Sequence, residues 1–486
     1  MIPLEYLLRD EVRLEPAAGD AWRLICESPL TVLTVNSAAA RLLESARRGI
    51  TVSALSTAGN MDEERVFAFC ERLRSLGILD VRRASVDPGF APRVTVIVPT
   101  RDRATELDEC LGALGRLDYP RDRAEVIVVD DGSDDPGAVA RTVARHGRRL
   151  IVNHQNRGPS YSRNRAAREA TGEILAFIDS DCVAGPSWLR ELTPYFSWAR
   201  VGAVGGRTVG YFDESNLDRY EEAASPLDMG KHLVVEAQGP STFYVPTCNL
   251  LVRRSTYEEM GGLREDLLVG EDVDLCWRLR GGGAYLVYAP EGVVRHKHRA
   301  HLMAMLRRRA EYGTSEAPLH ALHRDKRKRF AVAPAPLATV ALLSVALLLR
   351  DPRLLGASAV PSLWDGARRS SRLRRAGITM PVRTVWTSTL RGHLSALYFV
   401  YFHLVRYYLG PLAAAGLFAP GARWLGAAAV LYTAGVDYGT RRPRMSYPVY
   451  LGFYVAEHMA YQTGVIEGCV KAGTFRSYLP TVRSHV

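Results

Sequence analysis

Two carboxylates separated by one residue follow directly after an apolar run. Asp179 and Asp181 flank Ser180, and residues 174–178 before them are Ile-Leu-Ala-Phe-Ile. Carboxylate oxygens are hard ligands that suit Mg²⁺ or Mn²⁺, and transferases commonly hold such an ion between a few carboxylates and the phosphate oxygens of a substrate. Because acidic pairs are also common in turns and helix caps, this one indicates a metal site only if the neighbouring elements support it.

The elements before this pair predict a parallel sheet. Residues 94–98 and 125–129 are dominated by Val and Ile, as buried parallel strands are, and the segment 106–117 between them has apolar residues at helical spacing. Strand, helix and strand at this length predict a right-handed crossover. Ligands bind beyond the carboxyl ends of such strands, where we expect Asp131 and the 179–181 motif to meet.

A second acidic pair opens a predicted helix. Glu271 and Asp272 precede apolar residues at helical spacing over 273–279. Carboxylates in a first turn are stabilised by the positive end of the helix dipole. Helix capping alone would therefore account for this pair if no other motif were present.

Taken in order, these motifs resemble the inverting glycosyltransferases of family 2, which have the GT-A fold. The resemblance covers Val94 to about His298 and rests on these motifs: Ile97-Val98-Pro99-Thr100, Val128 to Ser133, Asn156-Arg157-Gly158 with Arg163-Asn164, Asp179-Ser180-Asp181, Gly270-Glu271-Asp272, and His296. It implies an α/β fold with a mostly parallel sheet and helices on both faces. It also implies a nucleotide-sugar donor, a divalent cation and inversion at the anomeric carbon.

The resemblance assigns residues to the nucleoside of the donor. Pro99 and Thr100 are expected to shape the loop around the uridine, and Asp131 to accept a hydrogen bond from the uracil. Asp102 is expected to contact the donor base, although the Arg101-Asp102 dipeptide departs from the residue types common at this point in the family.

Further residues are assigned to the diphosphate and the metal. Asp179 is expected to face the ribose and metal-bound water, while Asp181 and His296 bind Mg²⁺ or Mn²⁺. Arg163 would offset the charge of the diphosphate, and a solvated helix arginine is the alternative. The sequence leaves the metal-binding histidine open among three neighbours: His296, His298 and His301.

Asp272 matches the catalytic base of the family, with Glu271 as the second member of the catalytic pair. Direct displacement at an anomeric carbon needs a base opposite the leaving group to take the proton of the acceptor hydroxyl. Asp179 and Asp181 belong on the diphosphate side and cannot take this proton.

The first 86 residues predict a separate α+β domain. Short strands over 12–14 and 22–25 precede a helix over 37–46 and a longer amphipathic helix over 62–76. This pattern resembles the winged-helix, PqqD-like peptide-recognition domains found in pathways to ribosomal peptide natural products. A structural cap or a DNA-binding winged helix is the alternative.

A PqqD-like module ahead of a family 2 transferase resembles the glycosyltransferases of the mycofactocin system. That resemblance implies transfer of β-linked glucose from UDP-glucose to a peptide-derived redox cofactor precursor. An exposed strand edge can capture an extended peptide by strand addition, which would explain recognition of such an acceptor. The Gln-x-x-Arg-Trp motif of processive synthases does not follow Asp272, which favours short additions.

Length and composition predict an intracellular protein of several domains. The 486 residues divide into predicted domains at 1–86, 92–325 and 330–486. Seven cysteines without C-x-x-C or Cys/His spacing argue against a disulfide framework or a structural zinc. The four charged residues before Val12 argue against a secretory signal.

The basic residues behind the net charge of +11 concentrate beside apolar segments. Basic runs at 324–329 and 368–375 flank the apolar stretch 331–349, and residues 394–419 and 424–436 are also apolar. Polybasic flanks indicate anionic lipid, whereas RNA binding would require interleaved aromatic residues, so no nucleic acid partner is expected. Positive charge on both sides contradicts a single crossing. We expect paired crossings, re-entrant hairpins or interfacial helices at the cytoplasmic face of the cell membrane, with a soluble helical domain as the alternative.

Three functions remain open on the sequence. The first is a transferase that acts on a peptide-derived acceptor, the second is a membrane transferase that builds a lipid-linked or cell-surface glycan, and the third is a peptide-recruiting scaffold without catalysis. The scaffold is the weakest because Asp179, Asp181, Asp272 and His296 are all present. The N-terminal module favours the first function over the second, since a glycolipid enzyme has no evident need of a peptide reader.

Overall fold

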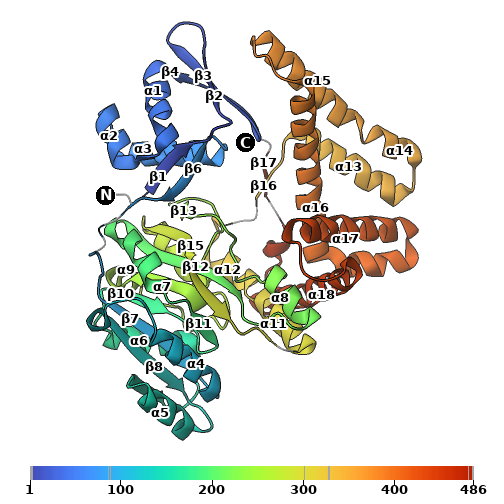
Figure 1. Ribbon diagram of the computed structural model, residues 1–486. Helices are drawn as coiled ribbons and strands as arrows, with labels where there is room; N and C mark the ends of the chain where they lie inside the picture. Colours follow the sequence, from blue (N-terminus) through green and yellow to red (C-terminus); the bar gives the residue numbers. More distant parts are fainter. Residues whose placement is uncertain are drawn as a thin grey trace.

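The computed structural model describes residues 4–85, 87, 89–299, 301–326, 329–479 and 481–483. An N-terminal unit of small sheets and helices lies above a large sheet with helices on both sides, and long helices from the C-terminal part lie beside both (Figure 1). The extra sheets, the large sheet and the helical C-terminal region agree with the predicted order of architectures.

The N-terminal unit is α+β, as predicted, and contains more elements than the sequence indicated. Its strands form two three-stranded sheets, with orders β5-β1-β6 and β2-β3-β4. The strands are β1 (Leu4–Leu8), β2 (Arg13–Pro16), β3 (Ala21–Glu27), β4 (Leu30–Asn36), β5 (Ile50–Thr51) and β6 (Leu79–Arg83), and the helices are α1 (Ser37–Ser45), α2 (Val52–Gly59) and α3 (Glu63–Ser75). Asn36 and Asp62 cap α1 and α3 through their side-chain oxygens, which explains why these two helices could be predicted.

An aromatic cluster joins the N-terminal unit to the large sheet. Phe67 of α3 meets the rings of Trp198 and Tyr285 edge to face, each at a centroid distance of 5.2 Å. Arg83 pairs with Glu191 at 2.8 Å across the same junction. The hydrophobic core is therefore continuous between the two units.

The large sheet has nine strands and is mixed rather than mostly parallel. Its order is β11-β15-β12-β14-β10-β7-β8-β9, with β13 paired to β15. Strands β10, β7, β8 and β9 are parallel to one another, and β12 is parallel to β15, but β14 runs antiparallel to both β10 and β12. The strands are β7 (Val94–Thr100), β8 (Ala124–Asp131), β9 (Arg149–Asn153), β10 (Ile174–Phe177), β11 (Cys182–Ala184), β12 (Val201–Gly210), β13 (Val234–Glu236), β14 (Leu250–Arg253) and β15 (Tyr285–His296). The prediction of a mostly parallel sheet was wrong because an apolar run shows that a strand is buried but not in which direction it runs.

Alternating residues of the central strands fill two separate cores. Val96 and Val128 pack on the side of the N-terminal unit, whereas Ile97 and Ile127 pack on the opposite side. Period-two alternation places successive side chains on opposite faces, so a strand covered on both faces is apolar throughout. The covering helices are α4 (Ala104–Leu114), α5 (Pro136–Arg145), α6 (Pro159–Glu169), α7 (Trp188–Leu192), α8 (Asn216–Ala224), α9 (Arg254–Glu259) and α10 (Glu271–Gly281).

The helices after the sheet fold back over one end of it. They are α11 (Leu302–Thr314), α12 (Glu316–Leu322), α13 (Pro334–Leu349), α14 (Pro352–Ala357), α15 (Val360–Arg375), α16 (Val382–Phe418), α17 (Pro420–Arg441) and α18 (Tyr447–Ala472). Strands β16 (Arg329–Ala331) and β17 (Thr481–Arg483) pair in parallel. Helices α13 to α15 extend away from the sheet, while α8, α11 and α18 lie together beside it (Figure 1).

Among the described residues, none of the helices combines the length and the apolar composition that crossing a bilayer requires. The predicted apolar stretch 331–349 forms α13, which has only 16 residues. Arg327 and Lys328 of the predicted basic run lie outside the described residues.

Glycines allow α11 and α18 to approach each other closely. A Cβ atom added to Gly464 of α18 would lie 1.8 Å from the carbonyl oxygen of Ala310, and one added to Gly468 would lie 2.4 Å from that of Thr314. On the other side, a Cβ on Gly313 of α11 would lie 2.3 Å from the carbonyl oxygen of Tyr461. The two helix backbones therefore lie so close together that a methyl group at these positions would force them apart.

We predict that Gly464→Ala destabilises the protein by about 1–3 kcal/mol, the typical cost of forcing extra methyl volume into close packing. The matched control is Gly452→Ala in the same helix, where an added Cβ meets no atom within 4 Å. Replacing an exposed helix glycine by alanine is neutral or stabilising by about 0.4–1 kcal/mol. Thermal or denaturant unfolding of both variants measures the difference, and equal stabilities would contradict the close packing of α11 on α18.

Candidate active site

A cavity of about 750 Å³ opens beyond the carboxyl ends of β7, β8 and β10, a volume typical of ligand sites. One wall comes from these strand ends and from α6, and the other comes from α10, α11 and α12. The sequence-predicted residues that line it are Pro99, Thr100, Asp131, Arg163, Asp179, Asp181, Glu271, Asp272 and His296. Nine of the ten predicted site residues therefore meet in one cavity.

Asp181 and His296 provide a site that fits a hard divalent cation. Nε2 of His296 lies 3.7 Å from Oδ1 of Asp181, because the pairing of β11 with β15 places these strand ends together. Burial lowers the pKa of His296, although Asp181 and Asp179 oppose this, so the imidazole is neutral and able to ligate a metal. The Sγ of Cys182 belongs to the same group of donor atoms, but burial raises the pKa of this thiol well above its usual value. The available ligands are thus a carboxylate and an imidazole, a set that suits Mn²⁺ or Mg²⁺.

The structure separates the three candidate histidines. Nε2 of His298 bonds Oδ1 of Asp218 at 2.8 Å, and the side chain is buried in that contact. His301 is exposed and precedes α11. His296 is the histidine that faces Asp181, in agreement with the prediction.

Arg103 is a cation in the cavity that sequence reasoning missed. Its Nη1 donates a hydrogen bond to Oδ2 of Asp181. Arg103 is the residue just before α4, and no local pattern indicates that it faces a strand end 78 residues away. It balances the charge of Asp181.

Pro99, Thr100 and Asp131 form the part of the wall assigned to the nucleoside. Oδ1 of Asp131 accepts hydrogen bonds from Nδ2 of Asn153 and from the backbone N–H of Arg157, and Oδ2 accepts one from the N–H of Gly158. This carboxylate therefore also holds the turn that begins α6. Oγ1 of Thr100 is buried without a hydrogen-bond partner among the described residues, which leaves it available to a ligand.

Asp102 is the predicted site residue that the structure places outside the cavity lining. Its Oδ1 accepts a hydrogen bond from the N–H of Asp134 at 2.7 Å, and its own N–H donates to Oγ of Ser133 at 2.9 Å. Asp102 has φ +54°, a left-handed conformation that aspartate tolerates. Through these two hydrogen bonds, Asp102 connects the loop after β7 to the loop after β8.

Arg163 is buried between two carboxylates rather than solvated. Its side chain is only 3% exposed, its Nη2 donates to Asp179 and its Nη1 donates to Glu271 at 3.3 Å. Burial alone would raise the pKa of Asp179, but the charge of Arg163 and its hydrogen bond lower it below its usual value. The solvated alternative for Arg163 was wrong, and the structure shows an ion-paired link between the two acidic motifs.

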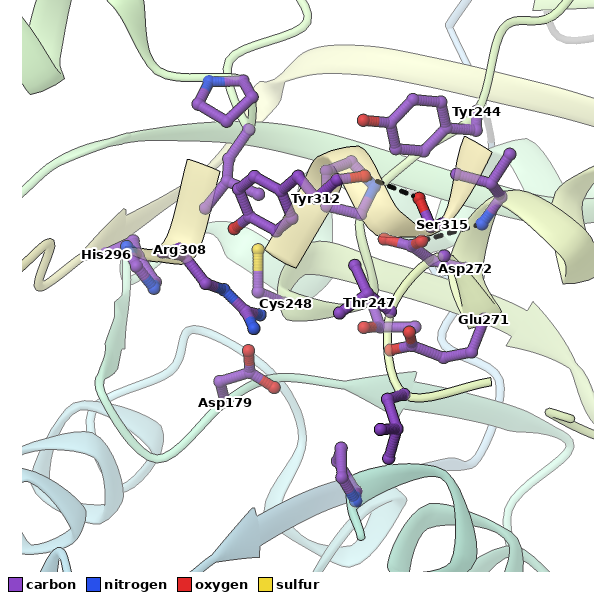
Figure 2. A pocket seen from close by; sticks show the side chains of 18 of the residues that line it. Asp179, Tyr244, Thr247, Cys248, Glu271, Asp272, His296, Arg308, Tyr312 and Ser315 are labelled. Atoms are coloured by element: carbon purple, nitrogen blue, oxygen red, sulfur yellow. Dashed lines mark hydrogen bonds between the residues drawn. The ribbon is translucent and has the colours of Figure 1, made fainter. Parts of the chain in front are cut away.

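Asp272 has the properties of a base. Burial, followed by the charge of Glu271, raises its pKa to about 7, although the N–H groups of Val273 and Thr247 hydrogen-bond it. The residue before this pair, Gly270, has φ +87°, and its Cβ would lie 3.1 Å from that of Ser315. Figure 2 shows Asp272 beside Ser315 on one side of the cavity and Asp179 with His296 on the other. A carboxylate with a pKa near neutrality can accept a proton and release it at physiological pH.

Helix α11 supplies cavity residues that the sequence did not reveal. Arg308 and Tyr312 line the wall opposite the strand ends, together with Tyr244 from the loop before β14. The sequence does show three consecutive arginines at 307–309, but only the folded chain shows which of them faces the cavity. Trp188 is fully buried and donates a hydrogen bond to Asn249, whereas Trp277 lines the cavity.

The sequence is similar to known glycosyltransferases. The family model described as glycosyl transferase family 2 matches residues 95–261. The pre-mycofactocin glycosyltransferase of Mycobacterium tuberculosis is 30% identical over 478 residues, which cover 96% of this chain and 96% of the relative. Glycosyltransferase AglE of Haloferax volcanii is 28% identical over 246 residues, which cover 50% of this chain and 79% of the relative.

Among solved structures, the mannosyltransferase PcManGT of Pyrobaculum calidifontis, in complex with GDP-Man and Mn²⁺, is 25% identical. The similarity covers 64% of this chain and 88% of that chain, with a TM-score of 0.39. Because the match to the Mycobacterium tuberculosis relative extends along nearly the whole of both chains, this protein belongs to glycosyl transferase family 2 and, within it, to the family of the pre-mycofactocin glycosyltransferase.

Proposed function

We propose that this protein is a metal-dependent inverting glycosyltransferase that moves glucose from UDP-glucose to a peptide-derived redox cofactor precursor. The observation that carries the proposal is Asp272, a carboxylate with a pKa near 7 across the cavity from Asp179, Asp181 and His296. A base and a diphosphate site on opposite sides of one cavity suit direct displacement at the anomeric carbon.

In this reaction the acceptor hydroxyl oxygen uses a lone pair to form the new bond to the anomeric carbon. The bond between that carbon and the β-phosphate oxygen breaks, and its electron pair leaves with UDP. Asp272 takes the hydroxyl proton on the acceptor side. Attack opposite the leaving group inverts the anomeric configuration, so an α-linked donor yields a β-linked product.

Asp181 and His296 would hold Mg²⁺ or Mn²⁺, and the bound cation would offset the charge of the diphosphate. Asp179 would face the ribose from the end of β10, held in place by Arg163. Pro99, Thr100 and Asp131 would contact the nucleoside, since they line the remaining part of the same wall. Asp102 would keep the loop that carries Pro99 and Thr100 in position.

Two observations support the proposed acceptor. The first is the name of the relative that matches along nearly the whole chain, pre-mycofactocin glycosyltransferase. The second is the N-terminal unit, which we take to be the PqqD-like peptide reader. One of its exposed large apolar side chains is Phe69 of α3, which is 37% exposed while other residues of that helix pack into the core.

We also propose that the protein acts at the cytoplasmic face of the cell membrane through peripheral contact. Exposed apolar side chains at Leu349, Leu363 and Trp364 lie on α13 and α15, and α15 ends in a basic run. The guanidinium of Arg368 lies 4.9 Å from the ring centroid of Trp364. Apolar residues beside arginines suit the boundary between headgroups and acyl chains.

The same exposed apolar side chains on α13 and α15 favour one alternative acceptor, a lipid-linked or cell-surface glycan. Such an acceptor would be presented at the membrane and would not need the N-terminal unit. The two acceptors are therefore distinguished by whether changes in that unit affect transfer.

For the metal site, Asp181→Asn is expected to abolish hydrolysis of UDP-glucose that depends on Mn²⁺ or Mg²⁺ and that EDTA inhibits. The reason is that one of the two protein ligands loses its charge. Asp118→Asn is the control, because Asp118 is an exposed residue paired with Arg190. Metal-dependent turnover of Asp181→Asn at the rate of the control would contradict the assignment.

For the base, Asp272→Asn is expected to lower transfer by roughly 10²- to 10⁴-fold while UDP binding is kept. In the wild type, kcat/KM should fall as the pH drops through about 7, because protonation of Asp272 removes the base. Glu271→Gln should move this acid limb to lower pH, since the charge of Glu271 contributes to the raised pKa of Asp272. An unchanged pH profile in Glu271→Gln, or full transfer by Asp272→Asn, would contradict the assignment.

For the acceptor, Phe69→Ala is expected to raise the KM for the peptide-derived acceptor by about tenfold, which corresponds to losing the burial of part of an aromatic side chain. The rate of UDP-glucose hydrolysis without acceptor serves as the internal control and should not change. If the acceptor KM also stays unchanged, the N-terminal unit does not recruit the acceptor through this face and the glycan alternative gains support.

A further inference from the structure

Three consecutive arginines of α11 have three different environments. Arg307 is exposed to solvent. Arg308 lines the cavity, and Figure 2 shows its guanidinium pointing toward Asp179. Arg309 is buried, where its Nη2 donates to Glu221 of α8 and its Nε lies 3.3 Å from Glu457 of α18. Of these three neighbours, one therefore faces solvent, one faces the cavity, and one is ion-paired inside the protein.

Two of the cations that the family 2 part supplies to the cavity are already committed to carboxylates of the site, and a third, Arg101, is paired with the half-exposed Asp102. Both Nη atoms of Arg163 bond acidic groups, Asp179 and Glu271. Arg103 bonds Asp181. The positive charges of these arginines are therefore already balanced by carboxylates of the protein before a diphosphate binds.

Among the described residues, the carboxylate that pairs with Arg308 is itself exposed. Nη1 of Arg308 lies 2.9 Å from Glu311, but that carboxylate is 55% exposed, and exposed ion pairs contribute little. The guanidinium also lies 4.7 Å from the ring centroid of Tyr312, which limits its orientations. Exchange of the exposed Glu311 for a diphosphate, which carries two negative charges in the donor, would therefore be favourable, and guanidinium groups match phosphate oxygens in geometry.

The backbone that carries Arg308 is held firmly. Arg309 ties α11 to α8 and α18 at the next position, and the close approaches at Gly464 and Gly468 begin one residue later along α11. A fixed backbone keeps the charge of Arg308 in place before the donor binds. Such preorganisation is what makes a cation effective at a developing charge.

We propose that Arg308 binds the β-phosphate of the nucleotide-sugar donor and stabilises the departing nucleoside diphosphate. When the bond from the anomeric carbon to the β-phosphate oxygen breaks, the electron pair moves onto that oxygen and Arg308 meets the added charge. The residue lies outside the segment that matches the family model, so a helix from the C-terminal side of the chain completes the donor site. This inference rests on the proposed use of a nucleotide-sugar donor.

The test compares Arg308→Gln with Arg307→Gln in the full-length protein. With Mn²⁺ present, Arg308→Gln is expected to weaken UDP binding measured by calorimetry by roughly tenfold, and to lower kcat/KM for transfer by roughly 10- to 100-fold. Binding of UMP, which has no β-phosphate, should be unchanged. Arg308→Lys should recover part of the loss because it restores the charge, and Arg307→Gln should behave as the wild type.

Equal loss of UDP and UMP binding in Arg308→Gln, with an unfolding temperature lowered relative to Arg307→Gln, would indicate a structural contribution and overturn the inference. Unchanged UDP binding and unchanged kcat/KM would overturn it as well. Repeating the titrations with GDP and dTDP tests the inference about Arg308 separately from the proposed use of UDP-glucose. If the wild type prefers one of these, UDP-glucose is the wrong donor, while the effect of Arg308→Gln on the preferred diphosphate still decides the inference.

Discussion

The buried guanidinium of Arg163 is the interaction on which the two halves of the site depend. It joins Asp179, at the end of β10, to Glu271, at the start of α10, and its side chain is 3% exposed. The side chains of Asp179 and Glu271 are 31% and 12% exposed, and keeping both carboxylates charged in this partly buried region is favoured by the cation between them. Removal of one partner from such a buried pair typically costs about 3–5 kcal/mol, because the remaining charge is left uncompensated. Arg163 therefore holds the diphosphate side and the base side of the cavity at a fixed separation.

The same arrangement explains why Asp179 and Asp272 have opposite properties. Arg163 donates directly to Asp179 and lowers its pKa, so this carboxylate stays charged. Asp272 has no such cationic donor among the described residues, and burial together with the nearby charge of Glu271 raises its pKa to about 7. Pairs of carboxylates whose environments separate their pKa values are typical of sites that need one permanent charge and one proton acceptor.

Local patterns in the sequence were sufficient for the parts of the fold that local chemistry determines. The Val and Ile runs of β7 and β8, the capped helices α1 and α3, and the acidic motifs at strand and helix ends were all predicted from short segments. The direction of β14 and the partners of Arg103 and Asp102 were not, because they depend on which distant segments meet. The charged residues of the apolar helices illustrate the same limit. In α16 the guanidinium of Arg406 lies 3.3 Å from the ring centroid of Tyr461 and 3.6 Å from Glu457, and composition alone does not reveal these partners.

The helices after the sheet contribute to both sides of the proposed reaction. A Cβ atom added to Gly270, just before Glu271 and Asp272, would lie 3.0 Å from Cδ1 of Leu319 and 3.1 Å from Cβ of Ser315, so this part of the helical region packs closely on the loop before Asp272. That cover produces the burial that raises the pKa of Asp272, while Arg308 from α11 faces the diphosphate side. A sheet with its loops alone would expose Asp272 to water, where its pKa would return toward the ordinary carboxylate value and it would be a weaker base. The pKa of Asp272 therefore depends on cover from helices that follow the segment matching the family model.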